Sequence, residues 1–292
     1  MKNTLLIITL SLCININSQE TSSKDSLWTK NGDIAILLNQ TGFSNWIGGG
    51  TNNFSGTIKF DYEWEFENQG WNWLTNFESA YGLAKFKNAP FARKIDDRIL
   101  IQSIIGKEFT KNLSFSAFFN FTSQLGRGYK YKKDDSNNET RELTTKIFSP
   151  AYFQLGSGFL WKKSEKLWIN YSPIASRLIL VSKMFTENLS DNEKYFGVDG
   201  NKSSRYELGA NLTFHSQGSL FENINYRQDL KLFSNYLEEP SNIDLDYLVQ
   251  IDFDINPLLS TQLMFQLIYD DNAISRLQVR EVFGIGAQLK LN

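Results

Sequence analysis

Histidine and cysteine are nearly absent from this chain, which contains one of each among its 292 residues. The single cysteine, Cys13, lies in an apolar N-terminal stretch that we expect to be removed. The mature chain would then lack disulfides, thiolate metal sites and cysteine nucleophiles. A lone His215 provides no histidine pair and no Glu-x-x-His arrangement. The sequence therefore predicts no metal, no cofactor and no catalytic residue.

Long apolar runs and an excess of basic charge are also missing. No run reaches the ~18 apolar residues that a membrane-spanning helix requires. A membrane could then be crossed only by a closed β-barrel, which pairs its backbone groups between strands. The formal net charge is −2. This charge excludes a broadly basic chain that binds nucleic acid, so we expect no nucleic-acid partner.

The N-terminus has the features of a secretory signal peptide. The chain begins MKNTLLIITLSLCININSQ, in which a basic residue precedes an apolar run and then small and polar residues. We expect cleavage after Ser18 and export into a bacterial envelope. A lipoprotein cleavage box at Cys13 is an alternative, but Leu12 is bulky where such a box has a small residue. The expected organisation is a signal peptide at 1–18, a short periplasmic segment at 19–30 and one barrel domain at 31–292.

An alternation of apolar and polar residues with a period of two runs through much of the chain. From Ile243 to Ile255 every odd position is apolar, whereas four even positions hold aspartates. Successive side chains of a strand point to opposite faces of the sheet, so this period predicts β-strands. Such a strand fits either a soluble sandwich or a membrane barrel with lipid outside and water inside.

The connections between the predicted strands favour the barrel. About twelve strands are separated in strict turn by short links and by longer polar loops. The short links include 68–70, 110–112, 163–166 and 216–219, and the longest loops are 128–147 and 183–202. Outer-membrane barrels have short periplasmic turns and longer external loops. The sequence therefore predicts an all-β fold, a single closed antiparallel transmembrane β-barrel in the bacterial outer membrane, in contact with its lipid.

Tryptophan positions agree with this topology. Five of the seven tryptophans lie within a few residues of a predicted short turn: Trp64, Trp71, Trp73, Trp161 and Trp168. Aromatic rings with a polar tip prefer the headgroup level of a membrane. The alternative is that the tryptophans fill a soluble core, but five of seven at one end of the fold is an awkward way to fill a core. We therefore predict that these five form an aromatic girdle at the periplasmic side of the barrel.

The polar face of the strands predicts the character of the lumen. An acidic row on the inner wall would consist of Asp244, Asp246, Asp252 and Asp254. Arg227 and Lys231 of the preceding strand would be its basic partners. We expect Arg227 near Asp252, and Lys231 near Asp246, allowing for the shear of the barrel. Rows of carboxylates favour cations in conducting pores.

Two classes of function remain open. The first is a narrow, cation-preferring pore for small solutes, because about twelve strands lie between small filled barrels and open porins. The second is a structural or scaffolding subunit of a larger outer-membrane assembly, with other envelope proteins as partners. An outer-membrane hydrolase is disfavoured, because His215 shares the lumen face of its strand near a predicted short turn. We therefore expect a non-enzymatic protein.

Three stretches resemble the recurring motifs of a Bacteroidota family of uncharacterised outer-membrane β-barrel proteins. This family is classified as a domain of unknown function. The three stretches are NQTGFSNWIGGGTNNFSG (Asn39–Gly56), RKIDDRI (Arg93–Ile99) and FTSQLGRGY (Phe121–Tyr129). The resemblance covers nearly the whole mature chain and implies an outer-membrane barrel with no assigned activity. We expect the barrel-assembly machinery as a partner during biogenesis. Many such barrels end on an aromatic residue that this machinery reads, whereas this chain ends in LKLN (Leu289–Asn292).

The most specific of these motifs lies in the first long loop. It contains Asn45 and Trp46, followed by Gly48, Gly49 and Gly50. Glycine permits positive φ and close backbone approach, so this loop can fold tightly. Asn45 and Trp46 would then pack over the barrel mouth as a constriction or a partner surface. The alternative is a loop that only needs to turn.

Overall fold

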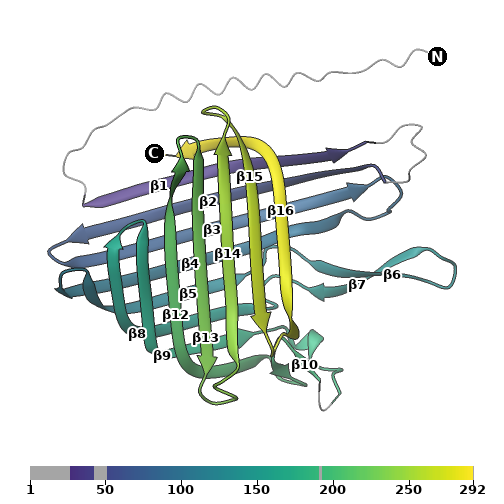
Figure 1. Ribbon diagram of the computed structural model, residues 1–292. Coiled ribbons are helices and arrows are strands. Elements are labelled where there is room, and N and C mark those ends of the chain that lie inside the picture. Colours follow the sequence, from purple (N-terminus) through teal and green to yellow (C-terminus); the bar gives the residue numbers. More distant parts are fainter. Residues whose placement is uncertain (1–26, 43–50, 191–192, 292) are drawn as a thin grey trace.

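The strands of the computed structural model form one closed antiparallel barrel (Figure 1). The structure describes residues 27–42, 51–190 and 193–291. Within them, twelve strands follow one another in the order β1-β16-β15-β14-β13-β12-β9-β8-β5-β4-β3-β2, and β2 pairs with β1 to close the ring. The prediction of a closed all-β barrel of about twelve strands is confirmed.

The barrel strands of the described chain are between 11 and 18 residues long. Their bounds are β1 (Trp28–Thr41), β2 (Asn53–Asn68), β3 (Trp71–Phe86), β4 (Arg93–Thr110), β5 (Leu113–Ser123), β8 (Ala151–Ser164), β9 (Leu167–Leu180), β12 (Ser204–Phe221), β13 (Ile224–Asn235), β14 (Ile243–Asp254), β15 (Leu259–Asp270) and β16 (Ile274–Leu291). The loops hold β6 (Gly128–Lys133), β7 (Glu139–Thr145), a short 3-10 helix η1 (Lys183–Phe185), β10 (Lys194–Tyr195) and β11 (Val198–Asp199). No helix among the described residues is long and apolar enough to cross a membrane.

Short turns and longer loops alternate along the chain and therefore gather at opposite ends of the antiparallel barrel. Short turns join β2 to β3, β4 to β5, β8 to β9, β12 to β13 and β14 to β15. The turn expected at 216–219 is wrong, because β12 continues to Phe221. Gln217 pairs with Arg227, and Ser219 pairs with Asn225, in the ladder between β12 and β13. This ladder satisfies backbone groups that an earlier turn would have left unpaired.

The two faces of the barrel wall have opposite character. Apolar side chains on the outer face are exposed, for example Ile58 (58 %), Phe115 (57 %) and Ile174 (64 %). Charged side chains on the inner face are buried, for example Lys59 (3 %) and Glu78 (4 %). A soluble sandwich shows the reverse, because it buries its apolar face between two sheets. The structure therefore excludes the sandwich.

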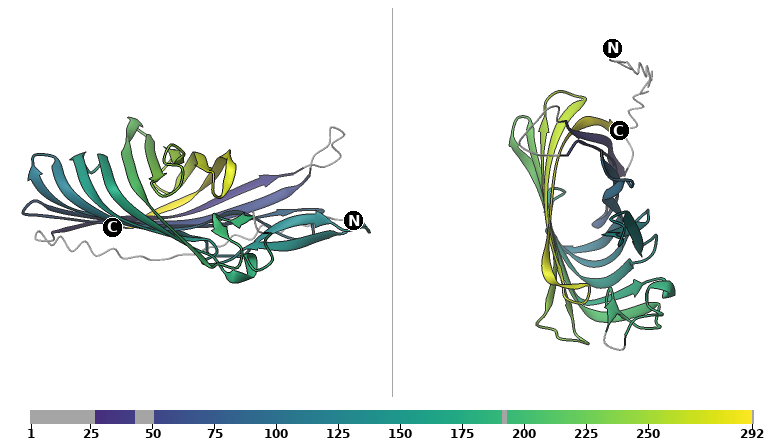
Figure 2. Two further views of the ribbon diagram at one scale, coloured as in Figure 1. Left: turned by 90° about the horizontal axis from the view of Figure 1, so that it is seen from below. Right: turned by 90° about the vertical axis from the view of Figure 1, so that its right-hand side faces the viewer.

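In Figure 1, β12–β16 stand steeply in front of β1–β5, which run across behind them, and Figure 2 shows the two walls from other sides.

Glycine allows neighbouring strands of the wall to approach closely. At Gly209 a Cβ atom would lie 1.8 Å from the backbone oxygen of Ser234. At Gly286 it would lie 2.0 Å from the backbone oxygen of Ile36. No side chain fits at either position without movement of the backbone, so both need glycine.

The β6–β7 hairpin projects beyond the loop end of the barrel (Figure 1). Two arginines stack on aromatic rings at its base. Arg93 lies 4.3 Å from the ring centre of Tyr131, and Arg141 lies 4.4 Å from that of Tyr129 and 4.6 Å from that of Phe91. These cation–π contacts tie the hairpin to the start of β4 and hold it outside the bore.

Candidate functional site

The acidic row of β14 lies on the inner face of the barrel and divides into two pairs. Asp244 and Asp246 lie toward the loops, whereas Asp252 and Asp254 lie toward the turns. Two uncharged residues of the same face, one of them the buried Leu248, separate the pairs. The row therefore presents negative charge to both halves of the lumen.

Amide side chains contact this row more often than cations do. Asp252 accepts a hydrogen bond from Nε2 of Gln262 (2.7 Å), and Asp246 accepts one from Nε2 of Gln266 (2.8 Å). Asp244 is the one member of the row with a salt bridge in the described chain, and Arg177 is its partner at 2.5 Å. Most of the negative charge of the row is therefore not neutralised by direct contact.

The two expected basic partners behave differently. Lys231 lies directly opposite Asp246 in the register of β13 and β14, although no salt bridge joins their side chains in the described structure. Arg227 lies opposite Gln250, two residues from Asp252. Its guanidinium turns away from the acidic row and contacts carboxylates elsewhere in the lumen.

Arg227 forms a salt bridge that crosses the bore. Its Nη2 donates to Glu78 of β3, and β3 and β13 are six places apart in the ring of twelve strands, which puts them on opposite walls. Its Nε donates to Oδ2 of Asp229 at 2.7 Å. Arg98 lies 3.3 Å from the other oxygen of Glu78. We name Glu78, Arg98, Arg227 and Asp229 the mid-lumen layer.

His215 supports this layer from one side. Its Nδ1 lies 2.7 Å from Oδ1 of Asp229, and its ring stacks on Trp168 with 5.1 Å between the centroids. The side chain of His215 is 9 % exposed. His215 therefore lies on the lumen face, as expected, where its ring is packed and one of its nitrogens is engaged by a carboxylate.

Trp168 departs from its expected place in the girdle. It is 5 % exposed and lies on the inner face, in an apolar cluster whose other buried members are Ile104, Phe118, Leu160, Ala175 and Phe233. Pairing between β8 and β9 shifts register after Lys162, close to this residue. Alternation with buried Asn170 and Ser172 on the same strand was the sequence signal that Trp168 points inward. The lumen wall is therefore partly apolar. The charged residues of the lumen face did not predict this apolar part.

The other four tryptophans of the expected girdle lie on the outer face near the turns. Trp71 (45 %), Trp73 (41 %) and Trp161 (38 %) are exposed, and Trp64 packs on Tyr62 with 4.5 Å between the ring centroids. Trp73 donates a hydrogen bond to Oγ of Ser103 at 2.9 Å, and Nζ of Lys107 lies 5.1 Å from the ring centre of Trp71. The expected mouth loop, with Asn45, Trp46, Gly48, Gly49 and Gly50, lies outside the described residues.

The mid-lumen layer lies between two chambers of the lumen. A loop-side chamber of about 420 Å³ lies above it and a turn-side chamber of about 310 Å³ lies below it. Arg227 and Asp229 line both chambers. Acidic side chains also face the turn-side chamber, among them Asp33, Asp61 and Glu63. Arg227 and Asp229 thus lie at the boundary between the two chambers.

Most lumen cations away from this layer are also engaged in salt bridges. Lys162 contacts Glu65, and Arg177 contacts Glu207 in addition to Asp244. Arg177 and Glu207 belong to the neighbouring strands β9 and β12. The contacts from Lys162 to Glu65 and from Arg177 to Asp244 join strands that are not neighbours, β8 with β2 and β9 with β14. The lumen wall is therefore braced internally.

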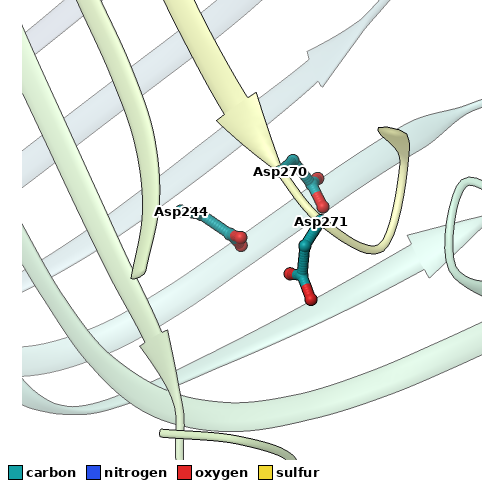
Figure 3. Close-up of side chains that lie close together, drawn as sticks. All are labelled: Asp244, Asp270 and Asp271. Carbon is teal, nitrogen blue, oxygen red and sulfur yellow. The ribbon is translucent and has the colours of Figure 1, made fainter. Parts of the chain in front are cut away.

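Three carboxylates converge at the loop end of β14 and β15 (Figure 3). One oxygen from each of Asp244, Asp270 and Asp271 lies within 4.8 Å of the others. Asp244 also forms a salt bridge with Arg177, and Asp270 accepts hydrogen bonds from the backbone nitrogens of Asn272 and Ala273. Exposed acidic groups often adopt such an arrangement without an ion, so the cluster alone does not define a metal site.

Part of the chain matches a known family. Residues 38–129 match the family described as "Protein of unknown function (DUF3078)", and this segment contains all three motifs named above. The match covers less than half of the chain. No curated protein shows a significant sequence match.

Several solved outer-membrane proteins are similar in structure at low sequence identity. The translocator domain of the autotransporter NalP from Neisseria meningitidis is 9 % identical over 89 % of this chain and 88 % of that chain, with a TM-score of 0.42. An outer membrane channel from Pseudomonas putida F1 is 10 % identical over 89 % and 94 %, with a TM-score of 0.36. The toluene transporter TodX from Pseudomonas putida is 9 % identical over 90 % and 88 %, with a TM-score of 0.30. With such TM-scores these similarities carry no argument about activity.

Proposed function

We propose that this chain is a non-enzymatic barrel of the bacterial outer membrane that forms a narrow, cation-preferring pore for small solutes. In the conformation described, the mid-lumen layer closes the pore. The observation that carries the proposal is the unequal pairing of charges in the lumen. Arg98, Arg177 and Arg227 are all held in salt bridges, whereas Asp246 and Asp252 have no cation within salt-bridge distance among the described residues. The wall therefore has a negative potential, which low-dielectric surroundings strengthen.

The outer surface supports a place in the outer membrane. Its exposed apolar side chains suit contact with lipid, and Trp71, Trp73 and Trp161 suit the headgroup level at the periplasmic side. The route to this membrane would be a signal peptide cleaved after Ser18, followed by insertion through the barrel-assembly machinery. The match of residues 38–129 supports membership of the Bacteroidota family that the motifs resemble.

The absence of catalysis is part of the proposal. His215 is enclosed between Asp229 and Trp168 on the inner wall. A general base needs access to the proton that it removes. A substrate too large to enter the closed bore could not reach this imidazole.

Reversal potentials in planar bilayers under a salt gradient test the cation preference. The key variant carries Asn at all four positions of the acidic row of β14. We expect the wild-type pore to prefer cations and this variant to lose most of the preference, because carboxylates in the wall attract cations. A matched control is Asp134→Asn with Asp135→Asn, since both residues lie at the tip of the β6–β7 hairpin. Unchanged selectivity in the quadruple variant would contradict the proposal.

A structural barrel is the second candidate, and the salt bridge from Glu78 to Arg227 is the observation that favours it. A bore closed by buried ion pairs suits a subunit that contacts other envelope proteins and conducts nothing. Absence of conductance in the wild type and in Arg227→Ser, with both proteins folded, would support the structural barrel over the pore.

A further inference from the structure

We propose that the loop-side chamber is a binding site for a small organic cation, an ammonium group carried on an apolar body. This inference deepens the proposed function, since it names the class of solute that the chamber would accept. It rests on the proposed cation preference only for the solute's passage, because binding requires no more than the folded barrel. The volume of the loop-side chamber, about 420 Å³, lies within the range of small-molecule sites.

Carboxylates of the chamber remain available to a cation. Asp246 and Asp270 both line it, and neither has a cation within salt-bridge distance among the described residues. Their hydrogen bonds come from neutral donors, the side chain of Gln266 and the backbone of residues 272 and 273. Each carboxylate can therefore accept further hydrogen bonds from an ammonium group.

A buried amide oxygen supplies an independent observation. Asn120 lines the same chamber from β5 and is 5 % exposed. Its Nδ2 donates to Oε1 of Gln154 at 3.3 Å, whereas its Oδ1 has no hydrogen-bond partner. A buried acceptor without a partner is costly. A ligand that donates hydrogen bonds would satisfy this oxygen.

The chamber also has an apolar part. Leu100 (7 %), Phe233 (4 %) and Leu248 (9 %) line it and are buried. An inorganic cation would gain nothing from these side chains, whereas an apolar body would be removed from water by them. The combination favours an organic ammonium over a metal ion.

The pattern of charges disfavours an anion. Arg98, Arg177 and Arg280 line the chamber, but each is held by a carboxylate, Glu78, Glu207 and Asp96 respectively. Lys231 is the one lining cation without a salt bridge in the described chain. One lysine faces two unpaired carboxylates, so the negative charge prevails.

An acidic path leads into the chamber from the loop end. A rim pocket of about 290 Å³ is lined by Glu238, Glu239 and Asp271, and Asp244 belongs to both this pocket and the chamber. Figure 3 shows Asp244, Asp270 and Asp271 close together at this junction. The mid-lumen layer closes the other end of the chamber, so a cation that enters from the loops would be held there.

Titration calorimetry on the detergent-folded barrel tests the proposal with three probes of similar shape: benzylammonium, benzyl alcohol and benzoate. We expect benzylammonium to bind, and benzyl alcohol and benzoate to bind at least about tenfold more weakly, a difference of one order of magnitude in Kd. The variant Asp246→Asn with Asp270→Asn should lose about tenfold in benzylammonium affinity. The matched control is Asp33→Asn with Asp61→Asn, which removes two acids from the turn-side chamber and should keep wild-type affinity.

Three outcomes would overturn the inference: equal binding of benzoate, equal loss of affinity in both double variants, or binding of Ca²⁺ without binding of benzylammonium. Asn120→Leu is a second variant that leaves every charge in place, and we expect it to weaken benzylammonium binding too. Heat-dependent gel mobility verifies that each variant is folded. Failure of binding beside a cation-selective conductance would contradict this site alone, whereas binding without any conductance would contradict the pore alone.

Discussion

At the scale of single residues, the contact between Glu78 and Arg227 joins opposite walls of the barrel between the two chambers. Glu78 is 4 % exposed and is shared by Arg98 and Arg227. Removing one partner of a buried ion pair leaves a charge without compensation, which costs more than removing both partners. The pair is therefore important for closure whether or not it adds to net stability.

Replacing Arg227 should both open and destabilise the barrel. We expect Arg227→Ser to raise single-channel conductance, because the two chambers would join, and to lower the free energy of unfolding by about 3 kcal/mol. The double variant Glu78→Gln with Arg227→Gln should be less destabilised than Arg227→Gln alone. Planar-bilayer recordings and urea unfolding of the detergent-folded protein measure the two effects. A double variant whose loss equals the sum of the single losses would show that the two side chains do not interact.

At the scale of elements, strands of the barrel carry the lumen chemistry and the loops control access to it. The segment between β13 and β14 lies at the rim pocket and is tied to the rest of the loop end through Glu238. Its carboxylate lies 2.6 Å from Arg205 at the start of β12 and 3.4 Å from Lys194 of β10. Burial raises the pKa of Glu238, but Arg205 and Lys194 outweigh burial, so its pKa lies below the ordinary value of 4.5.

Acid should therefore release this loop. A carboxyl whose pKa is lowered in the folded state stabilises the folded contact above its ordinary pKa and loses that effect as the pH falls through the folded value. We expect a spin label on a cysteine at Ser241 to become more mobile as the pH falls below 4.5. Glu238→Gln should show high mobility at every pH, since it has no charge to lose. A label whose mobility is independent of pH in the parent protein would contradict the role of this contact.

At the scale of the whole molecule, the apolar exterior and the charged interior fit the proposed place of the barrel in a membrane. Outward side chains such as Ile58 and Ile174 would be exposed to water in any soluble form. A closed barrel satisfies its backbone hydrogen bonds between strands and needs no further partner in lipid. Outer-membrane barrels have short periplasmic turns and longer external loops, so we expect the loop end to face outward.

Thiol labelling of intact cells tests this orientation. The mature chain would contain no cysteine, because the single cysteine of the sequence is Cys13. We expect a cysteine at Asn188 or Asn137, in the longer loops, to react with an impermeant thiol reagent. A cysteine at Gln69 or Asn223, in short turns, should react only after the outer membrane is permeabilised. The reverse labelling would invert the proposed topology, and a soluble mature chain without detergent would exclude the membrane.

Local patterns determined much of the barrel wall. The period-two alternation of β14 and its neighbours specified which residues face inward, and strand length with turn chemistry specified the number and order of strands. Both are properties of short segments, because neighbouring side chains of a strand point to opposite faces wherever the strand lies. The register of Lys231 opposite Asp246 also followed from counting back along one hairpin.

Barrel closure decided what no local pattern contains. Glu78 and Arg227 are 149 residues apart and meet because β3 and β13 lie on opposite walls of the closed ring. The apolar cluster around Trp168 is drawn from five strands, so the pattern of β9 alone does not contain it. The sequence by itself determined which face of most strands enters the lumen, whereas the tertiary structure decided which of the inward side chains meet across it. The physical reason is that pairing within a hairpin depends on near neighbours, but contacts across a bore depend on strand number and shear together.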